Sequence, residues 1–76
     1  MATYSSVFGS LDISTRPKRR HAVALIVTEL IQIRQKENNY VQHMPANLQG
    51  SEAAAAAEDS IDLLTDAINI LLESYD

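Results

Sequence analysis

Cysteine and tryptophan are absent from this sequence of 76 residues, and glycine and proline occur only twice each. Without cysteine, the chain can form neither a disulfide nor a thiolate metal site. His21 and His43 lie at opposite ends of one predicted helix, so we expect no metal site and no cofactor. A chain this short commonly needs a disulfide, a metal or oligomerisation to be stable, and oligomerisation is the route that remains.

Catalytic motifs are absent as well. The sequence contains no glycine-rich phosphate loop, no nucleophile elbow and no HExxH motif. Neither histidine has a serine or carboxylate partner at a spacing typical of catalysis. The acidic residues Glu58, Asp59, Asp62 and Asp66 are typical of a solvated helix face rather than of a metal site. We therefore expect that the protein is not an enzyme.

Long apolar runs are also missing, and none approaches the roughly 20 residues that a membrane span needs. The first six residues lack the basic start and apolar stretch of a secretory signal, so we expect a cytoplasmic protein without membrane contact. Hydrophobic residues make up 46% and charged residues 21%, a globular composition. The net charge of −4 argues against a nucleic-acid binder, because that class usually carries a basic excess.

Two segments show the apolar periodicity of helices, at about 16–43 and about 52–75. A short proline-containing turn joins them, so we expect an all-α, antiparallel two-helix hairpin over residues 15–76. Residues 1–14 form a separate lead that fits an extended arm or a short helix equally well. The apolar seam of the first helix, interrupted by Glu37, is expected to be Val23, Ile26, Leu30, Ile33, Tyr40 and Met44. The seam of the second is expected to be Ala54, Ala57, Ile61, Leu64, Ile68, Leu71 and Tyr75.

Local signals define the helix ends. Thr15 is the expected N-cap of the first helix, and Pro17 fits its first turn because the missing amide proton costs little there. Pro45 ends this helix, since it disfavours a helical residue before it and has no amide proton. Ser51 is the expected N-cap of the second helix, and Glu52 places negative charge near its positive end.

Both helices carry more apolar residues than one seam can hold. A monomer seldom exposes so much contiguous apolar surface, so we expect a homodimer or higher homo-oligomer, in the simplest case a four-helix bundle. The surplus gathers at the end away from the turn, where we expect the subunit interface. Its residues are expected to be Leu25, Val27, Ile31, Leu63, Ile70 and Leu72.

Residues 16–21 hold four of the six Lys and Arg residues of the chain. This cluster could bind a phosphate group or an acidic partner, or it could pair with Glu73 and Asp76 at the end of the second helix. With two aromatic residues of the lead, it forms our candidate ligand or partner site. The residues of this site are Tyr4, Phe8, Arg16, Lys18, Arg19 and Arg20.

The turn Met44-Pro45-Ala46-Asn47-Leu48-Gln49-Gly50-Ser51, followed by Ile61, Leu64 and Ala67-Ile68, resembles a pattern in small helical-hairpin proteins of bacteriophages and mobile elements. The alanines after Ser51 depart from that pattern, which usually has acidic and aromatic residues there. The resemblance implies a phage-type protein in a bacterial cytoplasm, and such proteins often act stoichiometrically on a host protein or a host signal.

Three hypotheses for the function follow. The first is an oligomeric binding protein that inhibits or modulates a host protein, such as a component of bacterial defence. The second is a sponge for a nucleotide or another phosphate-bearing signal molecule. The third is a structural or assembly component, which no sequence feature distinguishes from the first.

Overall fold

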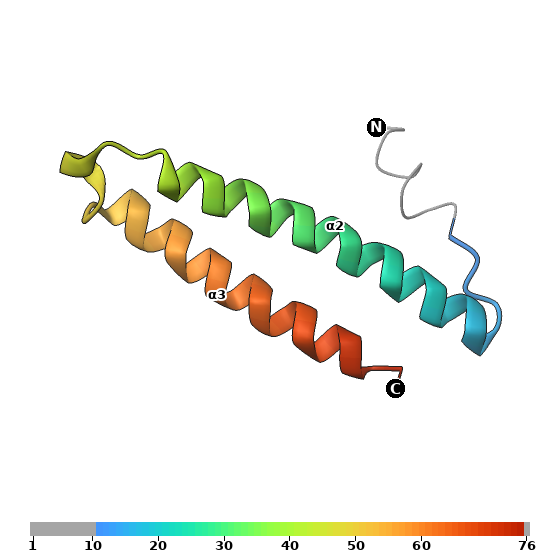
Figure 1. The fold of residues 1–76 in the computed structure, drawn as a ribbon. Coiled ribbons are helices and arrows are strands. Elements are labelled where there is room, and N and C mark those ends of the chain that lie inside the picture. Colours follow the sequence, from blue (N-terminus) through green and yellow to red (C-terminus); the bar gives the residue numbers. More distant parts are fainter. Residues whose placement is uncertain (1–10, 76) are drawn as a thin grey trace.

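The computed structural model describes residues 11–75, which form two long helices and one short turn of 3₁₀ helix. Helix α2 spans Arg16–Gln42, η1 spans Ala46–Leu48 and α3 spans Glu52–Glu73. The helices lie side by side and antiparallel, and α2 runs past the end of α3 (Figure 1). The expected all-α hairpin is confirmed, with helix ends that differ by at most two residues from the predicted ones. We call the end away from the turn the open end.

The two N-caps are those expected. The Thr15 hydroxyl accepts a hydrogen bond from the Lys18 backbone N–H at 3.3 Å, and Ser51 accepts one from Ala54 N–H at the same distance. Each bond satisfies an amide that has no partner inside its helix. Both cap residues have extended backbone, which turns the incoming chain sharply into the helix.

The connection between the helices is held by side-chain and backbone bonds. The Gln49 side-chain amide donates to the carbonyl oxygens of Met44 at 2.8 Å and Val41 at 3.3 Å, at the end of α2. The Val41 carbonyl also accepts from Met44 N–H at 3.2 Å, but neither carbonyl has the helical partner four residues on, so Gln49 acts as a C-terminal cap from across the turn. Pro45 accepts from Leu48 N–H at 2.9 Å and starts η1.

The seam between the helices differs in part from the predicted one. Ile33 and Tyr40, expected inside it, are 51% and 52% exposed. Val27, expected on the surplus surface, is 4% exposed and lies inside the seam. The predicted residues of α3 are all buried or half-buried, as expected. On α2 the buried and half-buried seam residues are Val23, Val27, Leu30, Arg34, Glu37, Val41 and Met44.

The polar part of this seam has a specific contact. The Arg34 guanidinium donates to the Thr65 hydroxyl at 3.2 Å, and that hydroxyl donates to the Ile61 carbonyl at 2.8 Å. Arg34 can occupy a seam position because its long stem packs beside α3 while its charged head reaches a polar partner. Across the turn end, Ala54 and Ala57 are buried and let the two helices approach closely.

The core is thin. Among the described residues, five apolar side chains are buried: Ala22, Val27, Ala54, Ala57 and Ile68. Three of the five are alanines, so few large side chains leave water within a single hairpin. Neither α2 nor α3 is long and apolar enough to cross a membrane. A core of this size gives a chain of 76 residues little margin of stability.

Candidate interaction surfaces

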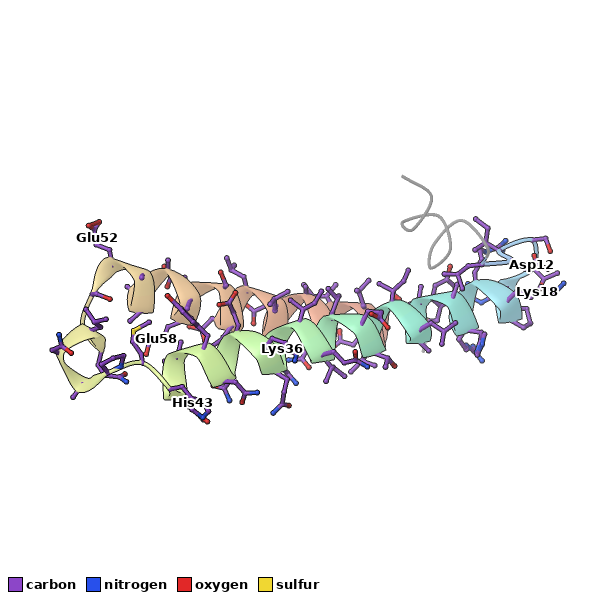
Figure 2. All side chains as sticks on the ribbon, turned by 90° about the horizontal axis from the view of Figure 1, so that it is seen from above. Asp12, Lys18, Lys36, His43, Glu52 and Glu58 are labelled. Atoms are coloured by element: carbon purple, nitrogen blue, oxygen red, sulfur yellow. The ribbon has the colours of Figure 1, made fainter. Side chains whose placement is uncertain are left out.

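The basic cluster sits at the open end and makes contacts within the chain. Lys18 Nζ lies 2.8 Å from Asp12 Oδ2, the one ion pair among residues 11–75. Arg19 Nη1 donates to the Ile13 carbonyl at 3.1 Å. Both contacts fasten residues 12–14 to the first turn of α2. Figure 2 shows Asp12 and Lys18 together at the end of the molecule opposite Glu52 and His43.

Two further arginines of the cluster meet the end of α3. The Arg16 guanidinium lies over the Tyr75 ring, 4.9 Å from its centroid, a cation–π contact between the two helix ends. Arg20 forms no hydrogen bond or ion pair within the described part of the chain, and it lines a small cleft with Leu72 and Tyr75. Arg20 is therefore the member of the cluster whose charge is most available to a partner.

The position of this cluster is electrostatically unfavourable for the helix. The first turn of α2 contains no acidic residue, and its charges are positive. Positive charge at a helix N-terminus opposes the helix dipole, at a cost of about 0.3 to 1 kcal/mol per exposed charge. Sequences depart from such local rules mainly where function requires it. The cluster is thus a stronger candidate for function than its internal contacts alone indicate.

Two apolar clefts adjoin the cluster, and Leu11 lines both of them. One, of about 270 Å³, is lined by Leu11, Ile13, Arg19, Ala22, Val23, Ile26 and Tyr75. The other, of about 300 Å³, is lined by Leu11, Asp12, Pro17, Lys18, His21 and Ala22. The open end therefore combines apolar recesses with a basic rim.

The structure places the predicted site residues in different surroundings. Arg16, Lys18, Arg19 and Arg20 are brought together, but Tyr4 and Phe8 lie outside the described residues. The expected pairing of the cluster with Glu73 is not found, since the described ion pair is to Asp12, and Asp76 lies outside the described residues. Sequence reasoning missed Asp12 and Tyr75 as partners, although Asp12 stands six residues before Lys18.

The ion pair changes the acidity of Asp12. The hydrogen bond from Lys18 holds the pKa of the Asp12 carboxyl below its ordinary value, and the backbone and hydroxyl of Ser14 lower it further. A carboxyl with a lowered pKa in the folded state stabilises that state above its ordinary pKa of about 3.9. This stabilisation is lost as the pH falls through the lowered pKa.

We expect Lys18→Met to raise the pKa of Asp12 toward its ordinary value. The substitution removes the largest cause of the shift and keeps the length of the side chain. The carboxyl carbon shift of Asp12, followed by NMR as the pH is lowered, measures the change. Lys36→Met, far from Asp12 on the same helix, is the control and should leave the midpoint unchanged. An unchanged midpoint in Lys18→Met would contradict the contact.

One broad side of the hairpin carries a row of exposed apolar residues. Seen from one end of the hairpin, one helix runs toward the viewer and the other runs away, so the two chains rotate in opposite directions. Residues that come one position before a seam residue therefore lie on the same side of the pair in both helices. Four of these residues, Ile33, Tyr40, Leu63 and Ile70, are 51% to 67% exposed. We call the apolar residues of this side the apolar face, and they are Ile26, Ile33, Tyr40, Ala56, Leu63 and Ile70. Glu29, Lys36 and His43 of α2 also come one position before seam residues and lie on the same side.

The opposite broad side is more polar. Residues one position after a seam residue lie there, and a cleft on that side is lined by Arg34, Gln35, Asn38, Ile61 and Thr65. Gln35, Asn38 and Thr65 come from both helices and share this cleft, which confirms that such positions lie on one side. The two sides of the hairpin therefore differ in chemistry.

The six residues predicted for the oligomer interface are divided among several surfaces. Leu63 and Ile70 lie on the apolar face, whereas Ile31 and Leu72 lie on the opposite side and Leu25 points away from α3. Val27 is buried between the helices and is not available to a second chain. Ile33 and Tyr40 were missed because the predicted seam had already included them. Ile26, Ile33 and Tyr40 follow one another at intervals of seven residues, and this spacing is the signal that places all three on one stripe.

Among residues 11–75, no group of His, Asp or Glu side chains is placed to hold a metal ion. No protein family, curated protein sequence or solved structure matches the chain. The phage-type resemblance of the turn therefore stays a prediction. Arguments about function rest on the open end and on the apolar face.

Proposed function

We propose that this chain is a non-catalytic binding protein that self-associates through its helices and binds another protein stoichiometrically through its open end. The observation that carries the proposal is the combination of apolar clefts and basic side chains at that end. An acidic protein surface with a projecting apolar side chain has the complementary chemistry.

The composition of the open end supports a protein partner. Interfaces are enriched in arginine and aromatic residues at their centres, and here Arg16, Arg19, Arg20 and Tyr75 lie within one small region. Arg16 and Arg19 are held by contacts within the chain, which lowers the entropy lost when a partner binds. The unfavourable placement of positive charge at the start of α2 also fits a binding role.

The turn pattern adds the biological setting of the proposal. Its resemblance to phage and mobile-element proteins favours a bacterial cytoplasm as the place of action. A partner of this chain is then a host protein that it inhibits or modulates, such as a component of bacterial defence. Stoichiometric binding needs no catalytic group, which agrees with the absence of catalytic motifs from the sequence.

Charge reversal at one position tests this proposal. The tagged chain is used to capture proteins from bacterial lysate, beside the variants Arg20→Glu and Gln32→Glu. Both substitutions place a carboxylate at an exposed position of α2, but only Arg20 lies at the open end, and Gln32 lies outside the apolar face. We expect a complex of fixed ratio with the unchanged chain and with Gln32→Glu, and binding weaker by on the order of tenfold with Arg20→Glu. Equal capture by both variants, or none by the unchanged chain, would refute the proposal.

A second candidate is a nucleotide or phosphate sponge, favoured by the cleft of about 270 Å³ beside Arg19 and Tyr75. A guanidinium binds phosphate well, and an aromatic ring can stack on a base. Ligand at 100 times its dissociation constant would stabilise the fold by about 2.7 kcal/mol. A panel of nucleotides that leaves the melting temperature unchanged would exclude this candidate.

A further inference from the structure

Helix α3 carries a second seam beside the one that faces α2. Its residues follow alternating steps of three and four, the spacing that packs one helix against another. None of them is charged, and the largest, Leu63 and Ile70, are 67% and 66% exposed. Together with the seam toward α2, this makes α3 a helix built for two neighbours. The second seam consists of Ala53, Ala56, Ser60, Leu63, Ala67, Ile70 and Ser74.

The apolar face has the size that a stable dimer needs. The 22 residues of α3 extend over about 33 Å, and two helices side by side are about 20 Å wide. The projected area is thus about 650 Å², and the side chains give it a larger accessible area. A standard interface buries roughly 800 Å² from each partner, so one copy of the hairpin can cover the face of another.

Charge is divided unequally between the two helices. All six Lys and Arg residues of the chain lie in α2, which also holds two acidic residues and carries a net charge of +4. Helix α3 holds six acidic residues and no basic one. Two copies of α3 placed side by side would bring twelve carboxylates to one edge of a dimer. Placing α3 beside α2 of a second copy brings opposite charges together instead.

Side-chain size favours the same pairing. Val27 and Leu71 line one cleft, and Arg34 bonds to Thr65, so these pairs show which residues of the helices lie at similar levels along the hairpin. With this register, the residues of the apolar face form three levels: Ile26 with Ile70, Ile33 with Leu63, and Tyr40 with Ala56. If α3 of a second copy covers α2, the large Tyr40 ring meets a small alanine, as close packing requires.

We infer that a second copy of this chain docks on the apolar face, with the twofold axis parallel to the helices, so that each α3 packs between α2 of its own chain and α2 of its partner. This deepens the self-association in the proposed function and rests on it. All neighbouring helices are then antiparallel and opposite in net charge. The two basic clusters lie at the same end, on diagonal helices about 13 Å apart, where physiological salt screens their repulsion.

The other twofold arrangement defines the alternative that the test must separate. With the axis perpendicular to the helices, α3 lies beside α3 of the partner, and the two turns lie at opposite ends of the dimer. The absence of cysteine allows a single Asn47→Cys substitution in the exposed turn, and a spin label attached there reports the distance between the turns. We expect about 20 to 25 Å, whereas the alternative gives about 40 Å, the length of the hairpin.

Two matched variants test the face itself by sedimentation equilibrium against the monomer mass of 8.4 kDa. Leu63 and Leu72 are both exposed leucines of α3, but Leu72 lies on the opposite side. We expect Leu63→Glu to raise the dimer dissociation constant on the order of 100-fold, because it buries an unpaired charge, and Leu72→Glu to leave it unchanged.

Each result has a distinct meaning. A monomeric unchanged chain would overturn both this inference and the self-association in the proposed function. A dimer with turns about 40 Å apart would overturn only the arrangement. If Leu72→Glu dissociates the dimer and Leu63→Glu does not, the choice of face is wrong. If Leu63→Glu fails to fold, the distance between spin labels at position 47 still decides between the two twofold arrangements. Partner capture by the Arg20→Glu variant tests the open end independently of all these results.

Discussion

Replacing Ile68 with alanine is expected to lower the free energy of unfolding by about 2 to 4 kcal/mol. Ile68 is 3% exposed and is the largest buried side chain among residues 11–75. The substitution removes three buried carbon atoms and leaves a cavity that two rigid helices cannot close. A chain of this size has only a few kcal/mol of stability, so the variant should be largely unfolded near room temperature.

Urea unfolding followed by circular dichroism measures this effect. Ile31→Ala is the matched control, because it is the same substitution at a position that is 39% exposed and lies on the side opposite the apolar face. We expect it to cost less than about 1 kcal/mol. All variants are compared at one protein concentration, since self-association makes the apparent stability depend on concentration. Equal losses in the two variants would mean that Ile68 does not form the centre of the core.

The hairpin could be predicted because its local signals agree. Thr15 and Ser51 cap the helices, and Pro45 stops the first one, as expected from the sequence alone. Each signal acts within a few residues of the chain, where the physics of capping and of missing amide protons is sufficient. The short turn then leaves antiparallel packing as the arrangement that buries both seams.

The seam of α2 could be predicted only in part because two apolar stripes compete on that helix. The predicted seam takes an apolar residue at each three- or four-residue step, which selects Ile33 and Tyr40. In the structure, Arg34 and Val41 lie in the seam instead. The difference is a rotation of the helix by one position, about 100°. A hydrogen bond to Thr65 makes Arg34 acceptable inside the seam, and periodicity alone cannot reveal a partner 31 residues away.

The basic cluster was visible in the sequence, but its contacts were not. The sequence indicated pairing with the acidic end of α3, and the structure instead uses Asp12, the Ile13 carbonyl and the Tyr75 ring. The chain before α2 folds back onto the first helical turn, so Lys18 and Arg19 contact residues that are six positions away in the sequence. The second seam of α3 was predictable in principle, because its three-four spacing is complete and free of charge.

Replacing Ala54 with leucine is expected to destabilise the protein by about 1 to 3 kcal/mol, because it overfills a closely packed contact. Ala54 is fully buried at 0% exposed, at the place where α3 begins and the turn holds it close to α2. Three added carbon atoms there must push the helices apart or bend the turn. The effect should spread to Ala57, the next seam residue along α3, which is 5% exposed.

The alanine run provides its own control for this experiment. Ala55 is exposed and lies in neither seam of α3, so Ala55→Leu changes the same residue type by the same volume at the adjacent position. Leucine is nearly as good a helix former as alanine, and we expect this variant to unfold at almost the unchanged urea concentration. If Ala54→Leu were as stable as Ala55→Leu, the helices could not be as close at the turn end as the burial of Ala54 requires. A loss confined to Ala54→Leu would show that close approach at this end, rather than helix propensity, explains the run of alanines.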